Sequence, residues 1–206
     1  MPLIKSISGF RGTIGGRPGD NLTPQDIVTC TAAFGQWIVD KTGIPTIVVG
    51  RDGRISGAIV SALVINTLRA MGISVIDLGL STTPTVEIAV PLEKAGGGII
   101  LTASHNPKEW NALKLVNHKG EFISAIDGAE VLEIVANESV DYAPVEKLGS
   151  YRQDDSYIQK HIAQILALSL VDVESVRAKN FRVVVDAINS TGALSVPPLL
   201  EALGCQ

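Results

Sequence analysis

Short apolar runs alternate with longer amphipathic stretches through the first half of this chain. The runs at residues 46–50, 73–78 and 99–101 are rich in Val and Ile and have the length of buried strands. Residues 58–71 and 83–94 lie between them and have the length of helices. Strands that are separated by helices pair in parallel, with the helices covering both faces of the sheet. The alternation therefore predicts a three-layer α/β/α fold with a mostly parallel sheet.

Flanking segments extend this pattern. A strand is expected at residues 4–8, and a helix that begins at Pro24 after an N-cap at Thr23 and ends at Gly43. Residues 127–137 form a further expected helix. Residues 113–116 and 121–123, joined by a short turn, predict an antiparallel hairpin on one edge of the sheet.

The second half of the chain predicts the start of another, similar α/β unit. Residues 139–152 lack periodicity and are interpreted as a linker, which divides the chain into residues 1–150 and 151–206. The second unit has a buried-type strand at residues 181–186 and a helix that ends near Gly204. Because one strand and its helices cannot bury their apolar surface, we expect either that residues 181–206 pair between copies of the fragment, or that residues 154–206 stay mobile while the first unit is folded.

Composition excludes several classes of function. The net charge is −4 and aromatic residues make up 4% of the chain, which disfavours nucleic-acid and anionic-membrane binding. There is no signal-peptide pattern and no apolar run of membrane-spanning length. Cys30 and Cys205 fit no metal spacing and are expected to be free thiols. A cytoplasmic protein is predicted.

Polar residues follow the run at residues 99–101 at once. Asn106, Pro107 and Glu109 resemble the capping box of a helix, which would place Ser104 and His105 between a strand end and a helix start. Free backbone N–H groups at such a place stabilise an anion, and a serine hydroxyl there can carry a phosphate. The alternative is an ordinary polar turn.

The string Thr-Ala-Ser-His-Asn-Pro at residues 102–107 resembles the phosphoserine loop of the α-D-phosphohexomutases. This family includes phosphoglucomutase, phosphomannomutase and phosphoglucosamine mutase. Other stretches resemble family elements in the same order: Ser-Gly-Phe-Arg-Gly at residues 8–12, Gly-Arg-Asp-Gly-Arg at residues 50–54 and Thr-Pro-Thr at residues 83–85. Ala112 and Ser190 depart from the family, which has glycine at both places.

The resemblance implies a role for each matching residue. Ser104 would carry the phosphoryl group that moves between the 6- and 1-positions of a hexose or hexosamine phosphate, through a sugar bisphosphate. Lys114 would be the acid/base, helped by His105, and Arg11 would lie beside the phosphate. Magnesium is the implied cofactor, and the phosphoserine oxygen of Ser104 would be its one ligand in this chain.

Further residues are implied to bind the phosphate or the substrate: Arg11, Arg51, Arg54, Thr102, Asn106 and Asn111. For Arg51 and Arg54 the alternative is an ion pair with Asp52 inside their loop. A glycine-rich loop is expected at residues 9–16. It contains Arg11 and matches neither the dinucleotide fingerprint nor the phosphate loop of nucleotide hydrolases.

The sugar is not determined by these residues, although the motifs are closest to phosphoglucosamine and archaeal-like mutases. The fragment alone is expected to be inactive. The alternative function is a non-catalytic anion-binding or interaction module on the mutase scaffold. A serine hydrolase is disfavoured because Ser104 lies in no Gly-x-Ser-x-Gly elbow.

Overall fold

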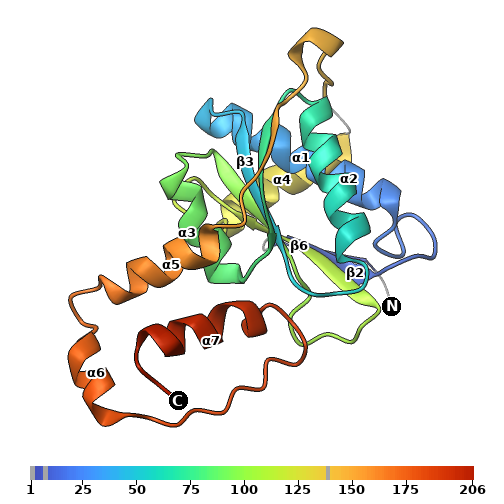
Figure 1. The fold of residues 1–206 in the computed structure, drawn as a ribbon. Coiled ribbons are helices and arrows are strands. Elements are labelled where there is room, and N and C mark those ends of the chain that lie inside the picture. Colours follow the sequence, from blue (N-terminus) through green and yellow to red (C-terminus); the bar gives the residue numbers. More distant parts are fainter. Residues whose placement is uncertain (1–2, 7–8, 138–139) are drawn as a thin grey trace.

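The computed structural model describes residues 3–6, 9–137 and 140–206 (Figure 1). In these residues the strands are β1 (Ile4–Ser6), β2 (Gly9–Thr13), β3 (Thr46–Arg51), β4 (Ser74–Leu80), β5 (Gly97–Leu101), β6 (Trp110–Val116) and β7 (Tyr151–Gln153). The helices are α1 (Pro24–Thr42), α2 (Gly57–Ala70), α3 (Thr83–Leu92), α4 (Ala125–Asn137), α5 (Tyr157–Leu166), α6 (Val173–Lys179) and α7 (Gly192–Ala202), with a short 3₁₀ turn, η1 (Val145–Lys147). None of these helices is long and apolar enough to cross a bilayer.

The strands of the described residues form one sheet in the order β1-β2-β6-β5-β3-β4-β7. The pairings β5–β3, β3–β4 and β4–β7 are parallel, whereas β5–β6, β6–β2 and β2–β1 are antiparallel. The α/β prediction is confirmed, but the sheet is mixed in direction, so the prediction that it is mostly parallel was wrong.

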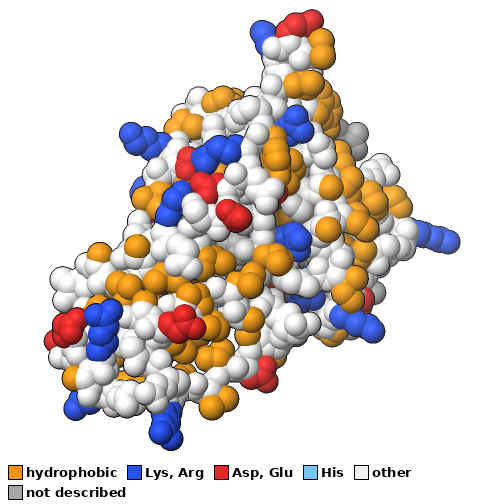
Figure 2. All heavy atoms as spheres, in the orientation of Figure 1, with side chains coloured by type: hydrophobic (Ala, Val, Ile, Leu, Met, Phe, Trp, Pro, Cys, Tyr) orange, Lys and Arg blue, Asp and Glu red, His pale blue; other side chains and the backbone are white. Residues whose placement is uncertain are grey.

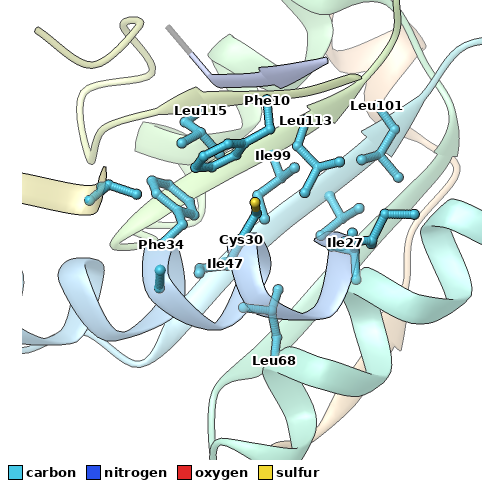
Figure 3. Close-up of a cluster of buried hydrophobic side chains, with 14 of the residues drawn as sticks. Phe10, Ile27, Cys30, Phe34, Ile47, Leu68, Ile99, Leu101, Leu113 and Leu115 are labelled. Atoms are coloured by element: carbon cyan, nitrogen blue, oxygen red, sulfur yellow. The ribbon is translucent and has the colours of Figure 1, made fainter. Parts of the chain in front are cut away.

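Helices cover both faces of this sheet, as the alternation predicted. Residues Ile47, Val49, Ile99 and Leu101 face α1, α2 and α4 and form the larger apolar core, part of which is drawn in Figure 3. Their neighbours Val48 and Ile100 point to the opposite face and pack with residues of α3 and α5. Side chains that alternate along each strand thus supply two cores.

Helix α1 begins and ends where the sequence predicts. The Thr23 hydroxyl accepts from the Asp26 N–H at 3.4 Å, and the Asp26 carboxylate accepts from the Thr23 N–H at 3.2 Å. Together they form a capping box, which satisfies free donors at the helix start. Gly43 ends the helix in the left-handed conformation, with φ 69°.

Three predictions for β6 and the strand paired with it were wrong. The expected helix start at Asn106 and Pro107 is a loop, and the chain continues directly into β6. The expected edge hairpin is absent from the described residues apart from one bridge between Val116 and Phe122, because β6 is apolar on both faces and lies between β2 and β5. The expected glycine-rich loop at residues 9–16 begins with β2, which pairs with β6 on one side and β1 on the other.

The second half differs more from the prediction. The predicted linker includes β7, which adds to the sheet beside β4. The predicted strand at residues 181–186 is irregular and largely exposed: Val184 is 99% exposed, and the segment's backbone bonds to the chain end at Gln206. No strand in the described range lies beside it, and a strand without a partner forms no ladder. α7 is present as expected, and both cysteines are free.

Candidate active site

The Ser104 loop, residues 102–109, connects β5 to β6 at the carboxyl end of β5. Ser104 has a φ of 53°, in the left-handed region that few residues other than glycine adopt. Its N–H donates to Thr102 Oγ1 at 3.1 Å, and the Asn106 N–H donates to the Ala103 carbonyl at 3.0 Å. Ser104 and His105 are exposed on this tight turn, whereas Thr102 is buried beneath it. The tight, hydrogen-bonded turn therefore exposes the serine hydroxyl to solvent.

The preceding loop, residues 52–56 between β3 and α2, supports the Ser104 loop. The Arg54 guanidinium donates to the carbonyl oxygens of Ser104 and Asn106, each at 2.7 Å, and to those of Pro107 in the same loop and Trp110 at the start of β6. Its Nε lies 3.3 Å from Asp52 Oδ2. Arg54 therefore makes the ion pair that was one of its two predicted roles, and contacts the backbone of the Ser104 loop.

Arg11 and Lys114 lie on one face of the sheet, next to this loop. Arg11 pairs with Ala112 across the β2–β6 ladder, and Lys114 follows two residues later on the same face. The Thr102 N–H donates to the Ala112 carbonyl at 3.2 Å, so Arg11, Ala112 and Thr102 form a row across the sheet. Two strand spacings are about 10 Å, which a long arginine side chain spans in large part.

A pocket of about 270 Å³ opens on this part of the sheet. It is lined by residues of β1, β2 and β6 together with Phe122: Ser6, Gly9, Phe10, Arg11, Ala112, Leu113, Lys114 and Phe122. Two cationic side chains in an open pocket beside an exposed serine are suited to bind an anion such as a phosphate ester. The side chain of Ala112, where the family has glycine, packs against Ala103 and Trp110.

Glu87 of α3 is an acidic neighbour of this pocket that the sequence analysis did not identify. Partial burial raises the pKa of the Glu87 carboxyl, and the charge of Lys114 acts in the opposite direction. Lys114 therefore lies close enough to α3 for an electrostatic interaction with the Glu87 carboxylate. The available signal was a single charged residue inside the otherwise uncharged helix segment Thr83–Leu92.

Two predicted site residues point elsewhere. Asn111 is fully buried, and its Nδ2 donates to Ser56 Oγ at 3.0 Å, at the start of α2. Arg51 donates to the Asp52 carbonyl at 3.2 Å and lines a second pocket with residues of α2, Asp77 and Tyr151. The structure therefore places Arg11 and Lys114 in one pocket, joins the Ser104 loop to β6 through Thr102 and Ala112, and places Asn111 and Arg51 on the α2 side.

A family model described as phosphoglucomutase/phosphomannomutase, alpha/beta/alpha domain I, matches residues 4–141. The chain belongs to this family. The match spans β1 to α4 and contains every residue of the candidate site, so it confirms the resemblance on which their roles were based.

Curated relatives carry the names of phosphoglucomutase/phosphomannomutase family members. The phosphoglucomutase/phosphomannomutase of Thermococcus kodakarensis is 36% identical over 199 residues, covering 95% of this chain and 43% of the relative. The phosphoglucosamine/phosphogalactosamine mutase of Sulfurisphaera tokodaii is 32% identical over 207 residues, covering 100% of this chain and 44% of the relative. The chain thus spans less than half the length of these relatives.

Solved structures agree with the fold. A phosphoglucomutase/phosphomannomutase family protein from Burkholderia thailandensis superposes with a TM-score of 0.76 at 26% identity, over 98% of this chain and 42% of the other. A structure named as a putative phosphomannomutase from Thermus thermophilus gives a TM-score of 0.79 at 24% identity, over 100% of this chain and 44% of the other, and supports the fold alone.

Proposed function

We propose that the full-length protein is a phosphohexomutase, which moves a phosphoryl group between the 6- and 1-positions of a hexose or hexosamine phosphate. The observation that carries the proposal is the exposed Ser104, in a left-handed turn at the end of β5, whose neighbouring strands β6 and β2 carry Lys114 and Arg11 in one pocket. Family membership and the names of the relatives support the class of reaction.

Ser104 solves a geometric problem in this reaction. One rigid site cannot hold both sugar hydroxyls in line with the same phosphorus, so a phosphate carried by the protein is exchanged instead. A sugar hydroxyl attacks the phosphorus of phosphorylated Ser104, the bond from phosphorus to Ser104 Oγ breaks, and a sugar bisphosphate forms. After the sugar turns over, Ser104 Oγ attacks the other phosphate and the product monophosphate leaves.

Lys114 and Arg11 have different tasks in this scheme. Lys114 is the proposed acid/base, which accepts the proton of the attacking sugar hydroxyl and returns a proton in the reverse step, and the exposed His105 assists. Arg11 faces the oxygens of the phosphoryl group in transit, whose charge its guanidinium stabilises. Thr102 and Asn106 support the turn that presents the phosphate.

Magnesium is the metal that the resemblance implies, and when bound it would neutralise charge on the phosphate. Within the described residues there is no group of three or more His, Cys, Asp or Glu side chains that could hold a metal ion. The acidic and histidine side chains described in this chain therefore do not make a magnesium site, and a phosphate on Ser104 is the one ligand that the candidate site offers.

We further propose a cytoplasmic enzyme that acts on small sugar phosphates and binds neither nucleic acid nor membrane. The free cysteines, one of them buried, and the net charge of −4 support this. The hexosamine is our preferred sugar, and assays of the full-length protein with glucosamine, glucose and mannose phosphates decide between the candidates.

Mass spectrometry of the full-length protein tests the proposal. We expect about 80 Da of added mass on Ser104 after incubation with a sugar bisphosphate, the mass of one phosphoryl group on a hydroxyl. Ser104→Ala should lose both the label and the mutase activity, while Ser156→Ala, which changes an exposed serine before α5, keeps both. Phosphate on another serine, with Ser104→Ala fully active, would refute the phosphoserine and favour a non-catalytic use of this site.

A further inference from the structure

We propose that Arg54, fixed by Asp52, is a positioning residue for Ser104, holding the Ser104 loop in the shape that presents the phosphoserine, and does not bind the phosphate itself. The inference rests on the proposed function, because it assigns a purpose to a contact beside the same site. It also decides between the two roles that the sequence left open for Arg54.

The four terminal N–H groups of Arg54 each donate to a carbonyl oxygen of the protein. Nη1 donates to the carbonyl oxygens of Pro107 and Trp110, at 2.8 and 3.0 Å. Nη2 donates to those of Ser104 and Asn106, each at 2.7 Å. The guanidinium has five N–H donors, and the remaining one, on Nε, is buried 3.3 Å from Asp52 Oδ2 without forming a hydrogen bond. Four donors are therefore occupied and the fifth is buried, which leaves none for a phosphate.

The four carbonyls explain why an arginine is needed here. The four carbonyl oxygens converge on the Arg54 guanidinium. Its planar fork supplies a donor to each oxygen, and its positive charge offsets the repulsion between them. The arrangement is largely shielded from water, since the Arg54 side chain is 10% exposed and that of Asp52 15%. A lysine at this position has a single ammonium group and cannot reach all four oxygens.

Asp52 connects this arrangement to the rigid sheet. The backbone N–H of Asp52 donates at 3.0 Å to the carbonyl of Leu101, which is the last residue of β5. The Oδ1 of Asp52 accepts from the backbone N–H of Arg54 at 3.0 Å. The loop at residues 52–56 therefore starts at the strand end from which the Ser104 loop leaves. Because both loops share this origin, Arg54 fixes the position of Ser104 relative to β5, and hence relative to Arg11 and Lys114 on the neighbouring strands.

The consequence for phosphoryl transfer is geometric. Ser104 has a left-handed backbone conformation, which a residue with a side chain does not favour. Contacts from the surrounding structure must therefore hold its backbone in place. A displacement of about 1 Å in a reacting group can lower a rate by roughly 10²-fold. Loosening the Ser104 loop should therefore slow transfer to and from Ser104 without removing any group that contacts the sugar.

The test uses Arg54→Lys and, as a second variant at the other end of the ion pair, Asp52→Asn. Arg177→Lys is the matched control, because Arg177 also forms an ion pair and donates to a backbone carbonyl, that of Ala202 at 2.9 Å, far from the site. Hydrogen exchange of residues 102–110 is measured in this chain. Turnover, KM for the sugar phosphate and the rate of Ser104 phosphorylation by a sugar bisphosphate are measured in the full-length protein.

We expect Arg54→Lys to speed exchange in residues 102–110 by about tenfold or more, and to lower kcat and the phosphorylation rate by roughly 10²-fold with KM nearly unchanged. Asp52→Asn should do the same to a smaller degree, and Arg177→Lys should do neither. If Arg54→Lys fails to fold, Asp52→Asn alone carries the test, with the same two readouts expected.

Three results would overturn the inference. Unchanged exchange in residues 102–110 would show that Arg54 does not order the loop, and faster exchange with a normal phosphorylation rate would show that the order has no catalytic purpose. A rise in KM with unchanged kcat would also oppose it, since that indicates a phosphate contact. Failure of the proposed function itself looks different, because Ser104 is then unphosphorylated in the unmodified protein, whatever the exchange shows.

Discussion

At the scale of single residues, the serine and the two cations of the candidate site come from different kinds of structure. Ser104 lies in a loop and has a positive φ, whereas Arg11 and Lys114 lie on paired strands, β2 and β6. The strands fix where the cationic side chains begin, and the loop fixes where the hydroxyl lies. A change in either cation should therefore affect chemistry more than folding.

Replacing Arg11 or Lys114 by Ala in the full-length protein should lower turnover by roughly 10²-fold or more, the usual scale for a positioned acid/base or charge-stabilising group. The melting temperature should change little, because Arg11 is exposed and Lys114 is only partly buried. Arg17→Ala and Lys119→Ala, which remove exposed cations of the same types, are the controls. Unchanged turnover, or a loss matched by unfolding, would contradict these roles.

Sequence analysis predicts candidate residues for this site but does not predict their contacts. The motif at residues 102–107 and the position of Lys114 were sufficient to predict Ser104, His105 and Lys114 as site candidates. The contact of Arg54 with four backbone carbonyls was not predictable, because it depends on how two loops meet in space and no side-chain pattern encodes it. Asn111 shows the same limit: strand alternation turns it toward Ser56.

At the scale of secondary-structure elements, β7 and α5 are attached to the first unit more firmly than a linker would be. Tyr157 is buried and its hydroxyl donates to Glu93, which also accepts from Arg152 Nη2 at 2.7 Å. Gly149, just before β7, packs directly on the backbone of Ile73, so that an added Cβ would overlap the Ile73 carbonyl oxygen. The chain therefore continues from η1 into the sheet without a flexible break.

Gly149→Ala should destabilise this chain by about 1–3 kcal/mol, the usual cost of overpacking, because backbone atoms must move to admit the methyl group. Thermal or urea unfolding measures the change. Gly53→Ala is the control, since an added Cβ there meets neighbours at 3.4 Å, an ordinary contact distance. Equal stability of both variants would mean that residues 149–153 are not packed on β4 as described.

The packing of α5 on α3 should depend on pH through His161. Its Nδ1 lies 3.0 Å from Thr85 Oγ1, and burial lowers the pKa of the imidazole below its ordinary value of 6.5. The unfolded chain therefore takes up this proton at a higher pH than the folded chain, so stability falls as the pH drops below about 6.5. The melting temperature of His161→Gln should fall less over the same range. An equal fall in both proteins would exclude His161 as the cause.

The elements that sequence analysis predicted correctly are those with strong local signals. α1 has both caps, and β3, β4 and β5 are apolar runs of Val, Ile and Leu with glycine or polar ends. The helix expected at Asn106 and Pro107 was wrong because the strand character of Trp110–Val116 and its two partner strands outweigh a local capping pattern. The position of β6 between β2 and β5 depends on contacts between segments far apart in the chain, and hydrophobic periodicity cannot predict such contacts.

At the scale of the whole molecule, the described chain has a compact sheet unit and a less packed second half. Figure 2 shows hydrophobic side chains gathered over the region of α5 and α7, and Phe181, Val184 and Ile188 are 51%, 99% and 81% exposed. A pocket between residues 183–185 and α7 is lined mainly by apolar side chains. Such a surface is available for pairing with further polypeptide.

Hydrogen exchange through residues 181–188 of this chain should be fast, whereas exchange in β3, β4 and β5 should be slow, since only the latter are central strands. Light scattering should show association that increases with concentration if copies pair through residues 181–206. Asp in place of Val184 should reduce that association and leave the sheet unit folded. A monomer at all concentrations with uniformly slow exchange in residues 181–188 would contradict this description of the second half.

The position of β6 between β2 and β5 also sets an order of events during synthesis. β2 leaves the ribosome before β3, β4 and β5, but its ladder with β6, from Gly9–Lys114 to Thr13–Trp110, requires a strand made after all of them. Pairing between segments so far apart closes a long loop and forms late. The nascent chain therefore makes the parallel strands β3, β4 and β5 before β6, and Arg11 reaches Lys114 only once the serine loop between β5 and β6 has been translated.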